Sequence, residues 1–162
     1  VLVIHDLLRA IGFERFTIHI NNRLVLSGLL EALGLAERAT DVLRTLDKLS
    51  KIGPAAVAEE LSTVAGATAE QAQRVVALAE LKGSNVQILE QLRPLVAGSE
   101  RGQEGVDRLS ELLATVAAAG LPPERVKLDV SIARGLDYYT GTVIETTLDD
   151  LPTIGSICSG GR

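Results

Sequence analysis

The sequence predicts an α+β fold in which a helical insertion interrupts a domain that contains β-strands. Residues 126–132 alternate apolar with polar or small side chains, the pattern of a half-buried strand, and residues 16–21 alternate in the same way. Between them, residues 38–122 carry one apolar stripe after another at helical spacing. We therefore divide the chain into residues 1–37, 38–122 and 123–162, with the outer segments forming a strand-containing core around the insertion.

The first segment is expected to form a helix, a strand and a second helix. An apolar stripe at helical spacing runs from the start of the chain and ends at Gly12. The strand covers residues 16–21. Asn22 suits the start of the next helix, because its side chain can accept a hydrogen bond from a free backbone N–H. Gly34 suits the end of that helix.

The middle segment is predicted to be helical throughout. One stripe runs from Val42 to Leu49, and Thr68 followed by Gln71 is the capping-box pattern that opens another helix. No period repeats cleanly, which argues against a solenoid. The glycines and prolines at which helices are expected to start, break or end are Gly53, Pro54, Gly66, Gly83, Pro94 and Gly120.

The last segment is predicted to contain three strands. The first is the alternating run of residues 126–132. Residues 142–148 form a second β-rich run and residues 153–158 a third. Gly135 and Gly141 lie between the first two strands and mark a loop there.

Composition excludes several functional classes. Hydrophobic residues make up 46% and charged residues 23%, which is ordinary globular usage and argues against disorder. The net charge of −5 argues against a generally basic surface for nucleic acid. One cysteine and two histidines give neither a disulfide framework nor a Cys/His metal cluster. No apolar run approaches the roughly 20 residues that span a bilayer, so we expect no membrane association and a cytoplasmic location.

Residues 133–141 hold the most informative run, which reads ARGLDYYTG. The adjacent Tyr138 and Tyr139 would point to opposite faces of an extended chain, so that one ring packs and the other presents its hydroxyl to a pocket. Arg134 offers a permanent cation whose planar fork suits a carboxylate or a phosphate. A tyrosine pair and an arginine at a strand end also fit a surface without a ligand. Residue chemistry alone leaves both interpretations open.

Three runs resemble the histidyl-tRNA synthetase family. Residues 132–145, IARGLDYYTGTVIE, closely match its second histidine-specific signature, and residues 155–162, GSICSGGR, resemble the glycine-rich strand that follows. Residues 18–23, IHINNR, resemble the segment before the helical insertion. The insertion, with LDKL at residues 46–49, looks like the version in eukaryotic and archaeal-type members. The likeness covers essentially the whole chain in the family's order.

The resemblance implies a class II aminoacyl-tRNA synthetase, whose catalytic core is an antiparallel sheet. Such enzymes activate histidine with ATP to histidyl-adenylate and transfer it to the 3′ end of tRNA(His). The parent protein would be a homodimer, and Mg²⁺ would accompany ATP, although no residue of this chain is identified as a ligand for the metal. The insertion would approach the acceptor end of the tRNA.

The resemblance also assigns site residues. Arg134 matches the arginine that contacts the histidine carboxylate and the α-phosphate, where it would stabilise developing negative charge as a catalytic group. Tyr138 and Tyr139 match residues that line the histidine pocket, one of them reaching the imidazole. Gly160 and Gly161 match backbone close to the bound amino acid.

The remaining candidates are expected to be structural. His5 and His19 are predicted to be packed or surface residues, because a single histidine is not by itself a site. Cys158 is predicted to be a small buried hydrophobe, since no paired base is evident.

The chain is expected to be an internal piece of a longer protein. We find no class II dimer-interface motif, no motif-two loop with its ATP-binding arginine, no motif-three arginine and no anticodon-binding domain. This polypeptide alone is therefore expected not to aminoacylate tRNA. Two other parents stay open: a paralogue that serves as a regulatory subunit of histidine biosynthesis, and a regulatory kinase domain that binds uncharged tRNA. The former generally lacks the long insertion, and the latter tends to lose the RGLDYY pattern.

Overall fold

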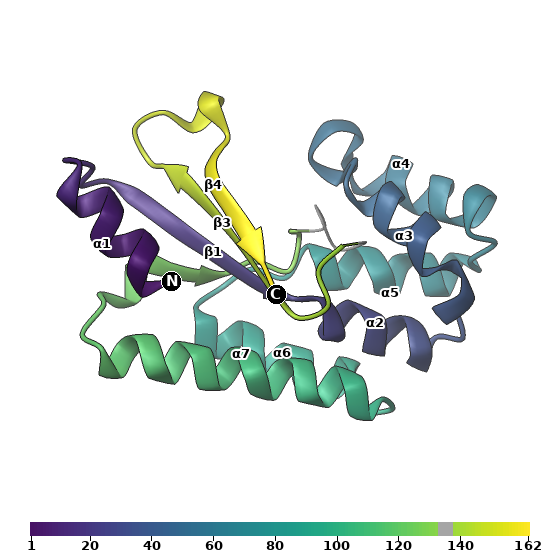
Figure 1. Cartoon of the computed structure of the whole chain (residues 1–162). Coiled ribbons are helices and arrows are strands. Elements are labelled where there is room, and N and C mark those ends of the chain that lie inside the picture. The colour runs from purple at the N-terminus through teal and green to yellow at the C-terminus, as the bar shows by residue number, and fades with distance from the viewer. Residues whose placement is uncertain (133–137) are drawn as a thin grey trace.

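The computed structural model describes residues 1–132 and 138–162, whose strands form one four-stranded mixed sheet (Figure 1). The strands are β1 Phe16–Asn22, β2 Val126–Leu128, β3 Thr142–Leu148 and β4 Ser156–Gly161. Their order across the sheet is β2-β1-β3-β4. β1 runs parallel to β2 and antiparallel to β3, and β3 runs antiparallel to β4. The sheet is thus antiparallel except at its β2 edge.

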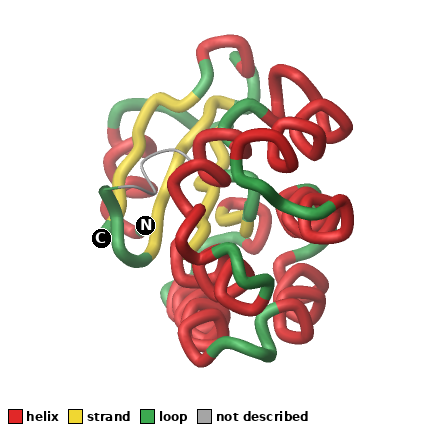
Figure 2. The backbone as a smooth tube through the Cα atoms, turned by 90° about the vertical axis from the view of Figure 1, so that its right-hand side faces the viewer, coloured by secondary structure: helices red, strands yellow, loops and turns green. Residues whose placement is uncertain are grey.

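The helices lie on two sides of this sheet. They are α1 Leu2–Ala10, α2 Arg23–Ala32, α3 Ala39–Leu46, α4 Leu49–Val64, α5 Ala69–Ala79, α6 Asn85–Leu95 and α7 Glu100–Ala118. Short 3₁₀ turns occupy Ala36–Arg38, Pro123–Arg125 and Pro152–Ile154. Figure 1 shows α6 and α7 beneath the sheet and α3, α4 and α5 grouped beside it, and Figure 2 shows the strands as a layer next to these helices. No described helix is long and apolar enough to cross a membrane.

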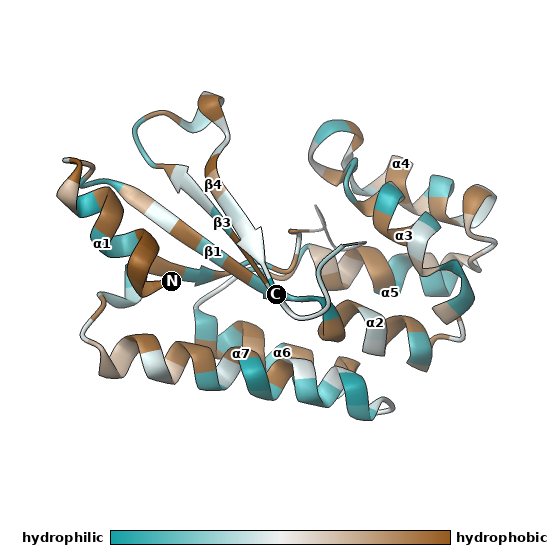
Figure 3. Ribbon diagram, viewed as in Figure 1, coloured by the Kyte–Doolittle hydropathy of each residue, from teal (hydrophilic) through white to brown (hydrophobic). Residues whose placement is uncertain are grey.

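The two faces of the sheet have different surroundings. Phe16, Ile18 and Ile20 point to one face, where α1 and α7 cover them, and each is at most 1% exposed. His19 and Asn21 point to the opposite face. Figure 3 shows the resulting bands of apolar and polar residues along β1. One face therefore lies in the core, and the other carries polar side chains, of which Asn21 is buried and His19 is partly exposed.

Glycines allow α2 and α7 to cross closely. A Cβ atom at Gly28 would lie 2.3 Å from the Cα atom of Gly102, and one at Gly105 would lie 2.7 Å from the backbone N of Val25. Such distances are far below van der Waals contact, so no larger residue fits without moving a helix. The side chain of Ser99 caps α7 at Gly102 N. This crossing fixes the helix that follows β1 against the longest helix of the described chain.

Most of the predicted helix boundaries are confirmed. Thr68 and Gln71 form the expected capping box, and Gly12, Gly34, Gly66 and Gly120 follow their helices with positive φ. The single helix expected from Val42 to Leu49 is wrong, because α3 ends at Leu46 and α4 begins at Leu49. The expected break at Gly53 is a kink inside α4, where φ is 79°.

Two of the predicted strands differ from the structure. The run of residues 126–132 is a strand only to Leu128, because the side chain of Asp129 accepts hydrogen bonds from the backbone N and the hydroxyl of Ser131 and closes a turn. The third strand begins at Ser156, not at residue 153, since Pro152–Ile154 forms a 3₁₀ turn. The second strand has the predicted bounds.

One hydrophobic core connects residues of all three segments of the chain. Leu29 of the first segment, Leu109 of the second and Val126 of the third are each at most 2% exposed in the same cluster. The division of the chain after residues 37 and 122 stays a prediction.

Candidate functional site

The ring of Tyr139 packs directly on the backbone of β4. A Cβ atom at Gly161 would lie 2.6 Å from Cγ of Tyr139 and 2.9 Å from the carbonyl oxygen of Thr142. Glycine at residue 161 is therefore a steric requirement of this contact. The structure thus brings together two of the residues that the sequence assigned to one site.

Backbone hydrogen bonds hold the end of the signature run against the end of β4. The N–H groups of Thr140 and Gly141 donate to the carbonyl oxygen of Arg162 over 2.7 Å and 3.1 Å. Arg162 N in turn donates to the carbonyl oxygen of Thr142 over 3.0 Å. On the other side, Arg23 N donates to the carbonyl oxygen of Gly141 over 2.9 Å. The chain that follows Tyr139 is fixed to both β4 and the start of α2.

The register of the sheet places this contact on its polar face. Gly161 lies opposite Val143, which lies opposite Asn21. Residues directly opposite in an antiparallel pair point to the same face, as do residues two apart on one strand. The ring of Tyr139 therefore lies on the same face as the side chains of His19 and Asn21.

The two tyrosines differ in exposure. Tyr138 is 83% exposed, whereas Tyr139 is partly buried against the core. Their rings meet edge to face with centroids 5.2 Å apart. One ring is therefore packed and the other exposed, and the role of either hydroxyl in a pocket stays a prediction.

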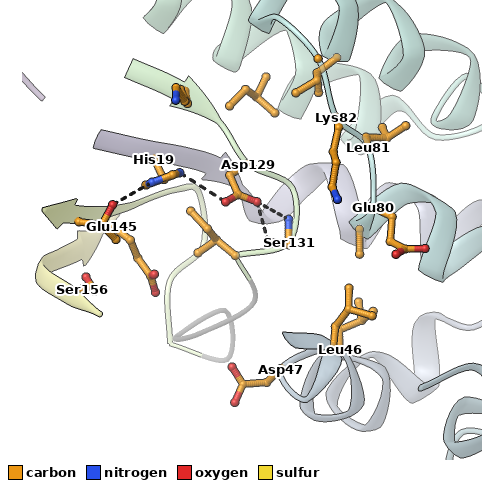
Figure 4. A pocket seen from close by; sticks show the side chains of 18 of the residues that line it. His19, Leu46, Asp47, Glu80, Leu81, Lys82, Asp129, Ser131, Glu145 and Ser156 are labelled. Atoms are coloured by element: carbon orange, nitrogen blue, oxygen red, sulfur yellow. Dashed lines mark hydrogen bonds and ion pairs between the residues drawn. The ribbon is translucent and has the colours of Figure 1, made fainter. Parts of the chain in front are cut away.

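An open cleft of about 780 Å³ lies between the polar face of the sheet and the helices α3 to α5 (Figure 4). Charged and apolar side chains line it together, as is usual in small-molecule sites. The strands and the turn after β2 contribute His19, Asp129, Ser131 and Glu145, and the helical side contributes Leu46, Asp47 and Lys82.

A hydrogen-bonded chain crosses the sheet wall of this cleft. His19 Nδ1 lies 3.4 Å from Asp129 Oδ2, and His19 Nε2 lies 3.2 Å from the hydroxyl of Thr147. Ser131 donates its backbone N–H over 3.0 Å and its hydroxyl over 2.6 Å to Asp129 Oδ1. Burial raises the pKa of Asp129, but the hydrogen bonds from His19 and Ser131 and the charge of His19 outweigh it, so that the pKa lies below its ordinary value.

The other predicted site residues have mixed outcomes. Gly160 lies beside Gly161, and nothing stands within 4 Å of a Cβ built on it. Arg134 falls outside the described residues. His5 stays structural, as expected, with its ring 5.9 Å from that of Phe16. His19 was expected to be a plain packed or surface residue, and the structure places it in the cleft wall.

Sequence reasoning missed Asp129, Ser131 and Glu145. Glu145 could have been predicted, because it is a charged residue within the correctly predicted strand of residues 142–148. Asp129 was hidden, because it falls within a run that alternates as a longer strand would. No group of three metal-ligating side chains occurs within residues 1–132 and 138–162.

Comparison with known proteins decides the family. A family model described as histidyl-tRNA synthetase matches residues 1–162. The chain belongs to the histidyl-tRNA synthetase family. It is 56% identical over 162 residues to a histidine–tRNA ligase from Rhodopirellula baltica, covering 100% of this chain and 37% of the relative. The histidyl-tRNA synthetase of a Nostoc species superimposes with a TM-score of 0.92 at 38% identity, over 99% of this chain and 38% of that one.

The chain corresponds to only part of these relatives. The chain spans 37% of the length of the Rhodopirellula ligase. Its fold is the α+β fold of a class II synthetase, as predicted. The expected likeness of the insertion to eukaryotic and archaeal-type members gains no support from these two relatives, because both organisms are bacteria.

A third comparison weakens one argument from the sequence. A protein named ATP phosphoribosyltransferase regulatory subunit/histidyl-tRNA synthetase, from Bacillus halodurans, superimposes with a TM-score of 0.81 over 98% of this chain and 40% of that one. At 24% identity the likeness shows the fold alone. Because it covers nearly the whole chain, the helical residues 38–122 do not by themselves separate a synthetase from a protein with this name.

Proposed function

We propose that the protein containing this chain is a histidine–tRNA ligase, which activates histidine with ATP to histidyl-adenylate and transfers it to tRNA(His). The observation that carries the proposal is the 56% identity to a histidine–tRNA ligase along the whole chain. The intact run RGLDYY at residues 134–139 supports it further. This chain would contribute one wall of the histidine site and the helices beside it.

Histidine would bind on the polar face of the sheet, at the contact between Tyr139 and Gly161. The partly buried Tyr139 is the better candidate for reaching the imidazole, because Tyr138 is 83% exposed. A hydroxyl that pairs with a ring nitrogen rejects side chains without one, since its own hydrogen bond would then go unmade. Gly161 leaves the space that the ring of Tyr139 fills, and Gly160, the residue before it on β4, would lie close to the bound amino acid.

Arg134 would bind the histidine carboxylate and the α-phosphate of ATP and stabilise the negative charge of the transition state. Mg²⁺ would accompany ATP in the parent enzyme. The described residues contain no group of three metal-ligating side chains. We also infer that the parent is a homodimer. We infer a cytoplasmic location as well, because the single cysteine, Cys158, fits a reducing compartment.

The second candidate is a regulatory subunit of histidine biosynthesis, because the match in fold to the Bacillus protein removes the helical residues 38–122 as an argument against it. Such a subunit would bind histidine without activating it. The identity of 24% to that protein, against 56% to the ligase, supports the ligase.

Histidine-dependent exchange of pyrophosphate into ATP by the full-length protein tests the proposal. We expect exchange with histidine and none with amino acids that lack an imidazole. The His5→Ala variant is a suitable control, because His5 lies on α1 and contacts Phe16 on the helix-covered face. Histidine binding without exchange would favour the regulatory subunit, and no binding at all would contradict both.

A further inference from the structure

The peptide unit between Tyr139 and Thr140 is held at both of its polar groups. The N–H of Thr140 donates to the carbonyl oxygen of Arg162, just after β4, over 2.7 Å. The carbonyl oxygen of Tyr139 accepts a hydrogen bond from Nη1 of Arg23 over 3.4 Å. Because a peptide unit is planar and includes the Cα atom of Tyr139, these two bonds fix the plane from which the tyrosine side chain projects.

Arg23 stands at the junction of β1 and α2, and the chain after Tyr139 is fixed to the same junction. Arg23 N donates to the carbonyl oxygen of Gly141 over 2.9 Å. The side chain of Asn22, 0% exposed, donates to the hydroxyl of Thr142 over 3.3 Å. Residues 139–142 therefore run between two fixed elements, the start of α2 and the end of β4 (Figure 1).

Arg23 also occupies a position where a helix disfavours a cation. It is the first residue of α2, whose first turn contains no acidic side chain. The free N–H groups at a helix N-terminus carry partial positive charge, so they repel a guanidinium and would be stabilised by a carboxylate. A residue that breaks such a local rule is expected to serve something other than its own helix. The hydrogen bond to Tyr139 accounts for an arginine at this position.

The hydrogen bond from Arg23 and the packing on Gly161 act on Tyr139 from two directions. Gly161 leaves the space for the ring, and Arg23 holds the main chain that carries it. The hydroxyl is the atom of a tyrosine farthest from the backbone, so a small rotation of the peptide unit displaces it more than any other atom. Precise placement of a binding group requires such support from the residues around it.

We propose that Arg23 is a positioning residue for the histidine site: it places Tyr139 by holding the carbonyl group of that residue. This role rests on the proposed function, in which Tyr139 reaches the imidazole. A side chain that is already held in its bound orientation loses less conformational entropy when the ligand binds. Loss of the guanidinium is therefore expected to weaken histidine binding and to leave ATP binding unchanged.

The kinetic test removes the donor of Arg23 and keeps the length of its side chain. In the full-length protein we expect Arg23→Met to raise the KM for histidine roughly two- to fivefold, the order of one hydrogen bond, with the KM for ATP unchanged. Arg23→Lys keeps a cationic donor on a long stem and is expected to recover part of the affinity. Arg93→Met is the matched control, because Arg93 also donates one side-chain hydrogen bond, over 3.0 Å to Asp107, but joins α6 to α7.

A double substitution tests whether Arg23 acts through Tyr139. Tyr139→Phe removes the hydroxyl that the guanidinium is proposed to place. In a protein that already carries Tyr139→Phe, Arg23→Met should therefore raise the KM for histidine little further, because residues that act as a unit are not additive. An equal increase in both backgrounds would overturn the proposal.

Hydrogen exchange judges the anchor without activity. Exchange at the amide of Thr140, which belongs to the held peptide unit, is expected to accelerate in Arg23→Met, to return toward wild type in Arg23→Lys and to stay unchanged in Arg93→Met. Unchanged hydrogen exchange in Arg23→Met would contradict the proposal. So would a histidine KM that stays constant, or one that rises only together with the KM for ATP.

The two readouts also separate this proposal from the function on which it rests. A wild-type protein without histidine-dependent pyrophosphate exchange would refute the proposed function. Hydrogen exchange at Thr140 would still decide whether Arg23 holds the peptide unit after Tyr139.

Discussion

The aromatic ring of Tyr139 occupies the space that a side chain at residue 161 would need: a Cβ atom on Gly161 would stand 2.6 Å from Cγ of the tyrosine. The two residues are 22 positions apart in the chain, and the backbone pairing of residues 140 and 141 with Arg162 brings them together. Gly161 is therefore required for the packing of Tyr139, whether or not a ligand is bound.

Replacing Gly161 by alanine is expected to displace the ring of Tyr139 and weaken histidine binding. Overpacking of this kind costs about 1–3 kcal/mol, and roughly 1.4 kcal/mol corresponds to a tenfold change in affinity. Titration of histidine into the full-length variant checks this. Gly98→Ala is the control, because its Cβ would meet only Ala32 at 3.6 Å. Wild-type affinity in Gly161→Ala would show that the packing of Tyr139 does not matter for the site.

The two tyrosines are expected to respond unequally to loss of their hydroxyls. Tyr139→Phe should raise the KM for histidine about fivefold, the order of one neutral hydrogen bond, because Tyr139 is partly buried on the polar face. Tyr138→Phe should have a smaller effect, since Tyr138 is 83% exposed. Pyrophosphate exchange at varied histidine concentration measures both. A larger effect at Tyr138 would reverse the assignment.

Asp129 is expected to make stability depend on pH in the acidic range. Its pKa lies below the ordinary value of 3.8 in the folded protein, because its hydrogen bonds with His19 and Ser131 and the charge of His19 outweigh its burial. A carboxyl group of this kind stabilises the fold above its unfolded pKa and loses that contribution as pH falls through the folded pKa. The Tm of Asp129→Asn should therefore lie below that of wild type at pH 5 to 7, and the gap should close below pH 4. A constant gap would contradict the pairing.

The crossing of α2 and α7 is expected to tolerate no added atom. In Gly28→Ala the new Cβ would stand 2.3 Å from the Cα atom of Gly102, where only backbone movement gives relief. Overpacking costs about 1–3 kcal/mol, which exceeds the gain of roughly 1 kcal/mol in helix propensity. Chemical denaturation should show a lower free energy of unfolding than in the control Gly98→Ala. A variant more stable than wild type would mean that the helices can separate at no cost.

Local patterns predicted the helices well, because capping residues and terminal glycines act within a few residues. Thr68 caps the helix that the sequence assigned to it, and Gly12 ends the first helix. The strand of residues 126–132 was predicted too long because the turn that Asp129 and Ser131 close ends it at Leu128. The buried Asn21 donates to the carbonyl oxygens of Val130 and Ile132, so that these two carbonyl groups have partners without a strand. Periodicity cannot reveal a partner more than 100 positions away.

The site was predicted in part for the same reason. Tyr139 and Gly161 were found because the signature run and the glycine-rich strand resemble those of the family. Residue chemistry alone did not decide between a ligand site and a surface without a ligand. The ion pair between His19 and Asp129 joins β1 to the turn after β2. Helices α2 to α7 separate the two residues in the sequence, so no local pattern could predict the pair. Only the parallel pairing of β1 with β2 brings these residues together.

Aminoacylation of tRNA(His) by the full-length protein, measured with labelled histidine, tests the central claim most directly. The account predicts transfer of histidine that depends on ATP, and loss of transfer when Arg134 is replaced by alanine. A folded full-length protein that binds histidine or uncharged tRNA but forms no histidyl-tRNA would contradict the ligase and identify a regulatory member of the family.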